Sequence, residues 1–214
     1  MNKSEFIETI KLSNGEVFHL EYHQNRINNT FSHFFPSEKV FSLKNIIGKQ
    51  SLPDDRKYKI RFLYNYNHYS IEIIPYKVAT VKSISCVDVG DFDYSYKFLD
   101  RTHLNLLKDK THTEEVIFLR NKKVTDASYA NLIFFDGSQW LTPTTFLLNG
   151  TCRQRLLNEG KIREMPIYEK DIASFECIGL INAMLDIGDL SLPISGQASS
   201  GSPLCPIGRT VAAG

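Results

Sequence analysis

The sequence predicts a mixed α/β (α+β) protein built from two domains. Short stretches of alternating apolar residues, typical of strands, recur along the chain among segments with helical spacing. A chain of 214 residues is long enough for two small domains, and its 42% hydrophobic and 23% charged residues are ordinary for a soluble globular protein. We expect domains over residues 1–85 and 86–195, followed by a flexible tail over 196–214 that is rich in small residues.

The N-terminal domain is predicted to begin with a hairpin. Residues 6–12 have strand character, Asn14-Gly15 is a strong turn signal, and residues 17–20 form the return strand. We expect helices over 21–35 and 39–47, followed by strands over 57–64 and 70–75.

The C-terminal domain is predicted to open with a strand over residues 92–99. Its even positions are all aromatic and its odd positions are polar, so the period of two places Lys97 opposite the aromatic face. The remaining expected elements, in order, are a helix (103–110), strands (115–120, 126–136 and 139–142), a helix (150–159), a strand (164–167), a short helix (169–176) and a strand (180–185).

Composition and the absence of common motifs exclude several classes of function. The formal net charge of +1 gives no overall attraction to nucleic acid or a membrane surface, and the apolar runs fall far short of the ~20 residues of a membrane span. The six histidines lack metal-ligand spacing, and no GxSxG, P-loop or GxGxxG occurs. The polar N-terminus and the separated cysteines indicate a cytoplasmic protein with reduced thiols; the four are Cys86, Cys152, Cys177 and Cys205.

Lys97 and Asp126 are the first candidates for a chemical role. A lysine can form an imine with an aldehyde, and a buried carboxylate can keep a pyridine nitrogen protonated; pyridoxal phosphate chemistry needs both groups. Most lysines are nevertheless solvated surface residues, and Asp126 could simply cap a turn. Either residue alone therefore indicates little.

Two segments could bind a phosphate. Gly150-Thr151-Cys152-Arg153 is predicted to begin a helix, whose free backbone N–H groups suit an anion. Arg26 could bind a phosphate through two nitrogens. An ordinary helix start and a surface arginine are the commoner outcomes for such residues.

Taken together, five segments resemble the class IV aminotransferase family, the fold-type IV pyridoxal phosphate enzymes. Ile7–Ile10 resembles the family's F-E-T-h strand, and His23–Arg26 resembles its H-x-x-R. Lys97–Arg101 is similar to K-x-x-[ND]-R, Val124–Leu132 to [VT]-T-E-x-x-x-x-N-[IL]-F, and Gly150–Arg153 to G-[IV]-x-R. Each motif is weak alone, but the five follow one another in the family's order over roughly residues 5–195.

The resemblance implies a role for each matching position. Lys97 would be the catalytic residue that bonds to the cofactor and moves protons, Asp126 would face the pyridinium nitrogen, and Arg26 would contact the phosphate. It also implies a cleft between the domains for the cofactor, a homodimer and a small-molecule amino substrate. The spacing of the histidines gives no reason to expect a metal. The expected cofactor-binding residues are Arg26, Lys97, Asp126, Asn131, Gly150, Thr151, Cys152, Asn182 and Ala183.

The reaction is chosen from the segment Asn182-Ala183. Aminotransferases of the family often have Gly-Thr-Ala there, whereas Asn-Ala resembles the lyases, so we expect a 4-amino-4-deoxychorismate lyase of folate biosynthesis. The alternative is an aminotransferase for branched-chain or D-amino acids. A binding module that keeps the fold without the chemistry is a third possibility, since the chain begins almost at the F-E-T-h strand and has aspartate at position 126 where the family has glutamate.

Overall fold

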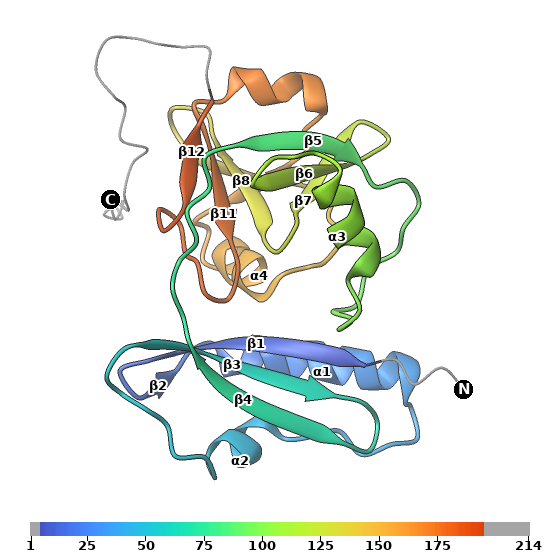
Figure 1. Cartoon of the computed structure of the whole chain (residues 1–214), viewed down its shortest axis with the longest axis vertical. Helices are drawn as coiled ribbons and strands as arrows, with labels where there is room; N and C mark the ends of the chain where they lie inside the picture. The colour runs from blue at the N-terminus through green and yellow to red at the C-terminus, as the bar shows by residue number, and fades with distance from the viewer. Residues whose placement is uncertain (1–4, 195–214) are drawn as a thin grey trace. The chain divides into compact units, whose positions relative to one another are not determined.

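The computed structural model describes residues 5–194, which fall into two compact units of mixed α/β structure (Figure 1). Within this range, unit 1 comprises residues 5–77 and 94–101, and unit 2 comprises 78–93 and 102–194. The predicted fold class is confirmed. The boundary differs from the division expected after residue 85, because the chain enters unit 2 at residue 78 and returns to unit 1 at 94–101. The predicted tail lies outside the described residues.

Unit 1 is an antiparallel sheet of four strands in the order β2-β1-β3-β4, with helices packed on one face (Figure 1). Asn14 and Gly15 both have positive φ, which the tight β1–β2 turn requires. The elements are β1 (Phe6–Ser13), β2 (Glu16–Val17), α1 (Leu20–Phe34), α2 (Leu43–Ile47), β3 (Lys57–Tyr64) and β4 (Tyr69–Pro75).

The core of unit 1 follows the period of two in β1. Phe6, Ile10 and Leu12 are fully enclosed and pack with Ile27 and Phe31 of α1. Position 8 shares this buried face, yet it is a glutamate, so a charged side chain is inserted into an otherwise apolar row.

The segment predicted as a strand over 92–99 is instead irregular, with one isolated bridge between Phe98 and Phe6. Its aromatic residues pack on different partners: Tyr96 stacks on His33 of unit 1, whereas Phe92 stacks on His103 of unit 2. The alternating aromatic residues therefore do not form one face of a strand, because they serve separate packing contacts. The prediction of a strand over 92–99 was wrong.

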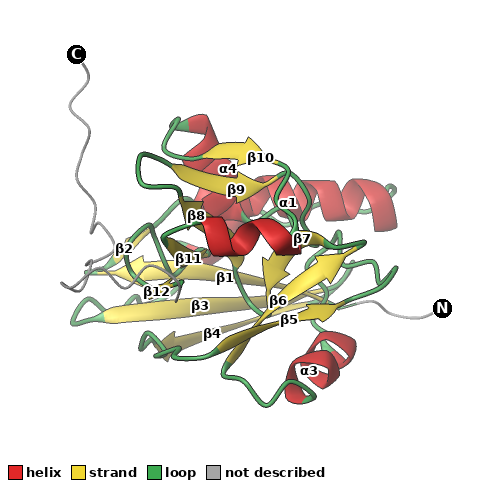
Figure 2. Cartoon of the chain, turned by 90° about the horizontal axis from the view of Figure 1, so that it is seen from above, coloured by secondary structure: helices red, strands yellow, loops and turns green. Residues whose placement is uncertain are grey.

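Unit 2 contains a sheet whose main path runs β10-β9-β8-β7-β6-β5, with β11 paired to both β8 and β12 (Figure 2). The predicted strand over 126–136 is two strands, because the chain reverses at residues 128–130. The strands are β5 (Ile84–Asp88), β6 (Glu115–Arg120), β7 (Lys123–Ala127), β8 (Asn131–Phe135), β9 (Trp140–Pro143), β10 (Arg163–Met165), β11 (Cys177–Ile181) and β12 (Ser191–Pro193). The helices are α3 (Thr102–Asp109), α4 (Thr151–Asn158) and a 3₁₀ turn (Glu169–Ser174).

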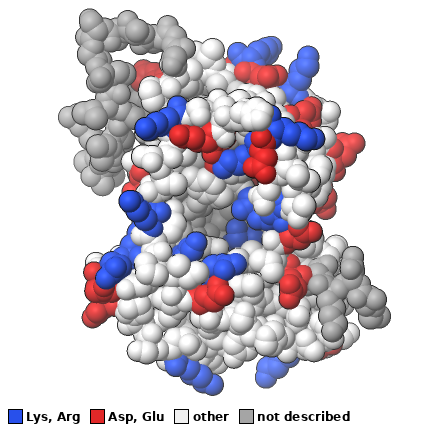
Figure 3. Space-filling view, in the orientation of Figure 1, with Lys and Arg blue, Asp and Glu red and all other residues white. Residues whose placement is uncertain are grey.

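Further features concern membrane spans, potential metal ligands, surface charge and cysteines. No helix in residues 5–194 is long and apolar enough to cross a membrane, and the same residues contain no group of three or more potential metal ligands. Acidic and basic side chains are interspersed on the face drawn in Figure 3. Cys86 and Cys152 are free thiols.

Candidate active site

Lys97 lies in unit 1, in a segment whose backbone is held against β1. The Ile7 N–H donates to the Lys97 carbonyl at 3.0 Å, and the Leu99 N–H donates to the Glu5 carbonyl at 2.8 Å. β2 pairs with this edge of β1 only at Leu12 and Ser13. The other end of the edge is therefore available to the segment that contains Lys97. Lys97 is half-buried, so its backbone position is fixed while its side chain is only partly enclosed.

Arg26 belongs to a buried cluster with Glu8 and His23. Its Nε donates to Glu8 Oε1 at 2.8 Å and its Nη2 to Oε2 at 2.5 Å, while His23 Nδ1 lies 2.6 Å from the same Oε2. Glu8 comes from β1, and His23 and Arg26 lie three residues apart on α1, so they share one helix face. Arg26 is thus fixed by the glutamate of the F-E-T-h segment, a residue to which the sequence alone assigned no role.

Electrostatics define the charge state of this cluster. Burial opposes ionisation of Glu8, but the charge of Arg26 and the hydrogen bonds from Arg26 and His23 outweigh it and lower the pKa to about 2. Burial lowers the pKa of His23, and the nearby positive charges of Arg26 and Lys97 act in the same direction. Glu8 is therefore a carboxylate at neutral pH, and a neutral His23 donates its Nδ1–H to it.

Asp126 lies on β7 in unit 2 and is almost fully enclosed, with 5% of its surface exposed. Its Oδ2 accepts the backbone N–H groups of Leu147 and Leu148, each at 2.8 Å, and its Oδ1 accepts Asn131 Nδ2 at 2.7 Å. Asp126 does not simply cap a turn, because its donors come from β8 and from the loop before α4.

Burial raises the pKa of Asp126 to about 6, even though the three hydrogen bonds act in the opposite direction. A positive charge placed beside this carboxylate, such as a protonated pyridine nitrogen, would favour its ionised form. Within residues 5–194, Oδ1 accepts one hydrogen bond, from Asn131, which leaves it a second acceptor position. Asp126 therefore suits the role that the resemblance implies.

Asn131 connects Asp126 to the start of α4. Its Nδ2 also donates to the Leu148 carbonyl at 2.9 Å, and its Oδ1 occupies the space where a Cβ on Gly150 would lie. Only glycine fits at position 150, because Asn131 packs directly against its backbone. Three predicted site residues, Asp126, Asn131 and Gly150, thus form one contiguous group.

The first turn of α4 offers backbone donors. Thr151 and Cys152 are buried. The N-cap residue is Gly150, which has no side chain to cap the helix. The Gln154 N–H donates to the Gly150 carbonyl at 3.0 Å, which is the bond that opens the helical ladder. The N–H groups that precede Gln154 in the first turn have no acceptor within an α-helix. Such amides, with the helix dipole behind them, suit an anion.

Asn182 and Ala183 lie in a tight turn beyond β11, not on a strand as predicted. Asn182 Oδ1 accepts the N–H groups of Met184 and Leu185 at 2.8 and 3.0 Å, and its Nδ2 donates to the Tyr129 carbonyl at 3.3 Å. The side chain closes its own turn, which is why the strand ends at Ile181. Asn182 thereby connects this turn to the reversal between Asp126 and Asn131.

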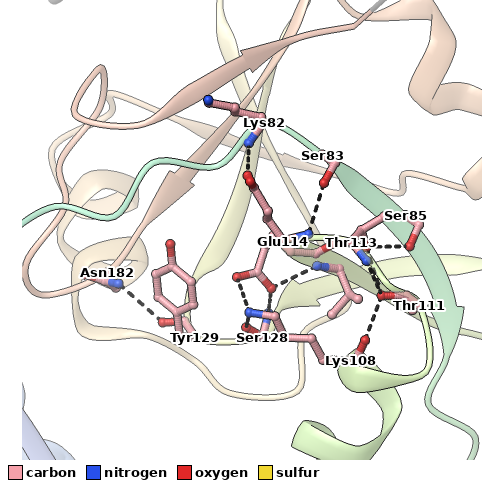
Figure 4. Close-up of polar contacts among 12 residues, drawn as sticks. Lys82, Ser83, Ser85, Lys108, Thr111, Thr113, Glu114, Ser128, Tyr129 and Asn182 are labelled. Carbon is pink, nitrogen blue, oxygen red and sulfur yellow. Dashed lines mark hydrogen bonds and ion pairs between the residues drawn. The ribbon is translucent and has the colours of Figure 1, made fainter.

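Glu115 holds the same reversal from another direction, through Ser128, which Figure 4 labels together with Tyr129 and Asn182. It is fully enclosed, its Oε1 accepts the Ser128 N–H at 2.8 Å, and its Oε2 lies 3.5 Å from Lys108 Nζ of α3. Sequence analysis missed Glu115 and Ser128. The only available signal was an acidic residue at the start of an apolar strand, which alone does not identify a buried group.

The predicted site residues therefore form two groups, each described within its own unit. Lys97 and Arg26 lie in unit 1, and Asp126, Asn131, Gly150, Thr151, Cys152, Asn182 and Ala183 lie in unit 2. Each group offers chemistry that pyridoxal phosphate needs: unit 1 has an amine for the aldehyde and a guanidinium for the phosphate, and unit 2 has a buried carboxylate for the ring nitrogen and backbone amides for a phosphate.

Replacing Gly150 with alanine should destabilise the protein. The new Cβ would overlap Asn131 Oδ1, and such overpacking typically costs about 1–3 kcal/mol. Urea denaturation would measure the change. Gly160→Ala is a useful comparison, since its φ of 66° strains alanine but no atom lies within 4 Å of the added Cβ. A Gly150→Ala variant as stable as the wild type would contradict the described contact.

The buried Asp126 should make stability depend on pH. Its pKa is raised from the ordinary 3.8 to about 6, so the folded state binds the proton more tightly, and this contribution is lost as pH rises through about 6. The full loss, which is complete only above both values, is about 3 kcal/mol, and about 2 kcal/mol of it falls between pH 4.5 and 7.5. Denaturation of the cofactor-free protein from pH 4.5 to 7.5 would show it as a trend that is absent in Asp126→Asn. The same trend in both proteins would assign it to another group.

Known proteins with related sequences cover most of this chain. The family model for amino-transferase class IV matches residues 5–191. A protein of Haemophilus influenzae with no assigned activity is 34% identical over 180 residues, which is 83% of this chain and 96% of the relative.

Solved structures show the same similarity. A Haemophilus somnus protein, provisionally named a 4-amino-4-deoxychorismate lyase, is 36% identical with a TM-score of 0.81, covering 87% of this chain and 100% of that one. A Mesorhizobium loti protein, provisionally named an amino-acid aminotransferase, is 18% identical with a TM-score of 0.70, covering 85% of this chain and 96% of that one. The second comparison shows a shared fold alone.

Proposed function

We propose that this chain, which belongs to the class IV aminotransferase family, converts 4-amino-4-deoxychorismate to 4-aminobenzoate and pyruvate. The family is pyridoxal phosphate-dependent. The observation that supports the lyase over an aminotransferase is the similarity to the Haemophilus somnus protein, whose whole chain matches at 36% identity and whose provisional name is this lyase. Asn182-Ala183, which resembles the lyases, agrees with that choice.

The proposed reaction needs a base, an anchor for the phosphate and a partner for the ring. Bound pyridoxal phosphate would supply an electron sink that acidifies the carbon bearing the substrate amine. Lys97 Nζ would accept the proton from that carbon, and the ring C–O bond to the enolpyruvyl group would break. Protonation of the released enolpyruvate at its methylene carbon gives pyruvate, so the reaction consumes no water and no second substrate. Asp126 would hold the pyridinium N–H, while Arg26 and the first amides of α4 would hold the phosphate.

Product analysis tests the proposal. Purified protein with pyridoxal phosphate and 4-amino-4-deoxychorismate should release pyruvate and 4-aminobenzoate in equal amounts without any keto acid. Amine transfer that requires a keto-acid acceptor would replace the lyase with an aminotransferase. A protein that gains no absorbance band on addition of the cofactor would support the binding module instead.

A further inference from the structure

Glu8 is a fully enclosed carboxylate in the apolar row of β1, and the proposed reaction assigns it no role. Its neighbours on the same strand face are Phe6 and Ile10, both completely buried. Removing a carboxylate from water costs several kcal/mol, and a buried ion pair often stabilises a fold no better than apolar side chains of similar volume. Stability alone therefore gives a weak reason for a glutamate at this position.

The geometry shows what Glu8 does to Arg26. The carboxylate accepts hydrogen bonds from Nε and Nη2 along one edge of the guanidinium, so Nη1 takes no part in this bidentate ion pair. The Arg26 side chain is 11% exposed, whereas Glu8 is not exposed at all. A flexible arginine is thereby fixed in one orientation, with the nitrogen that Glu8 does not occupy left to bind something else.

His23 fixes Glu8 in turn. It is 1% exposed, and its Nδ1 lies 2.6 Å from the Oε2 atom that also accepts Arg26 Nη2. Since the carboxylate can only accept, the imidazole donates, and both Glu8 oxygens then have partners. Glu8, His23 and Arg26 form a chain of oriented hydrogen bonds that runs from the helix face to the strand.

We propose that Glu8 and His23 are positioning residues that orient Arg26 to bind the phosphate of the cofactor through Nη1. This inference rests on the proposed function, because it takes that phosphate as the ligand. Lys97 is close enough for its charge to act on His23, so the amine expected to bond to the cofactor and the arginine expected to bind its phosphate share one neighbourhood of unit 1.

Two ligands, pyridoxal phosphate and pyridoxal, which lacks the phosphate, test this proposal. A variant that misplaces Arg26 should weaken binding of the first ligand only, whereas a general loss of structure should weaken binding of both. Titration followed by absorbance gives both affinities, and their ratio measures the contribution of the phosphate site. Glu8→Gln should reduce the preference for pyridoxal phosphate by about tenfold or more, as expected for a weakened charged hydrogen bond, and leave the affinity for pyridoxal unchanged. Glu72→Gln is the matched control, since it removes an Arg–Glu pair of the same unit that is exposed.

His23 provides a second pair of variants in case Glu8→Gln fails to fold. His23→Asn keeps an N–H donor near the place of Nδ1 and should retain the preference, whereas His23→Leu removes the donor and should reduce it. Glu8→Gln and His23→Leu proteins with a wild-type ratio, or with equal losses for both ligands, would overturn the inference. Wild-type protein without any preference for pyridoxal phosphate would contradict the proposed function itself, and this inference with it.

Discussion

Replacing Lys97 with alanine is expected to lower the rate of pyruvate formation by about 10³-fold or more, because the variant lacks the amine proposed to bond to the cofactor and to move the proton. The backbone at position 97 should remain in place, since it is held through the hydrogen bond from the Ile7 N–H to its own carbonyl. The measurement is the initial rate of pyruvate release under saturating cofactor and substrate, together with the absorbance of the protein–cofactor mixture.

Lys44→Ala is the control for this loss. Lys44 is an exposed lysine on α2 of the same unit, so its removal should leave the rate within about twofold of the wild type. Substantial activity in Lys97→Ala, with an unchanged absorbance band, would show that another amine bonds to the cofactor.

Asp126→Ala is expected to destabilise the cofactor-free protein by about 3 kcal/mol or more at pH 5. Two buried backbone N–H groups, those of Leu147 and Leu148, would lose their acceptor, and each such loss costs about 1–3 kcal/mol. At pH 5 the cost of burying the charge is partly relieved by protonation, since the pKa of Asp126 is about 6. Urea denaturation measures the change.

Asp136→Ala provides a matched comparison. Asp136 also accepts two backbone N–H groups, those of Ser138 and Gln139 at 2.9 Å, but it is exposed. Water can replace the lost acceptor there, so the expected cost is only about 1 kcal/mol. Equal effects at positions 126 and 136 would contradict the conclusion that burial makes the Asp126 contacts strong.

Sequence alone predicted most helices and strands of the fold, because they carry clear local signals. The Asn14-Gly15 turn, the alternation in β1 and the helix that begins after Gly150 depend on neighbouring residues, and each appears near its predicted place. The prediction of a strand around Lys97 was wrong because the packing of its aromatic residues depends on contacts distant in the sequence. Its aromatic residues alternate, but their packing partners belong to two different units.

The sequence predicted the site residues that belong to family motifs, but not the contacts that connect them. Asp126 and Gly150 could be placed by resemblance, whereas the Asn131 side chain that joins them is a tertiary contact. The roles of Glu8 and Glu115 also depend on distant partners, Arg26 in one case and Ser128 in the other. The alternation in β1 does place Glu8 on the apolar face of its strand, but the sequence does not identify Arg26 as its partner.

Chemical trapping can identify the lysine that bonds to the cofactor. Protein incubated with pyridoxal phosphate would be reduced with borohydride, digested and analysed by peptide mass spectrometry. We expect the added pyridoxyl phosphate mass on Lys97. The mass on a different lysine, or no stable addition at all, would contradict the proposed role of Lys97.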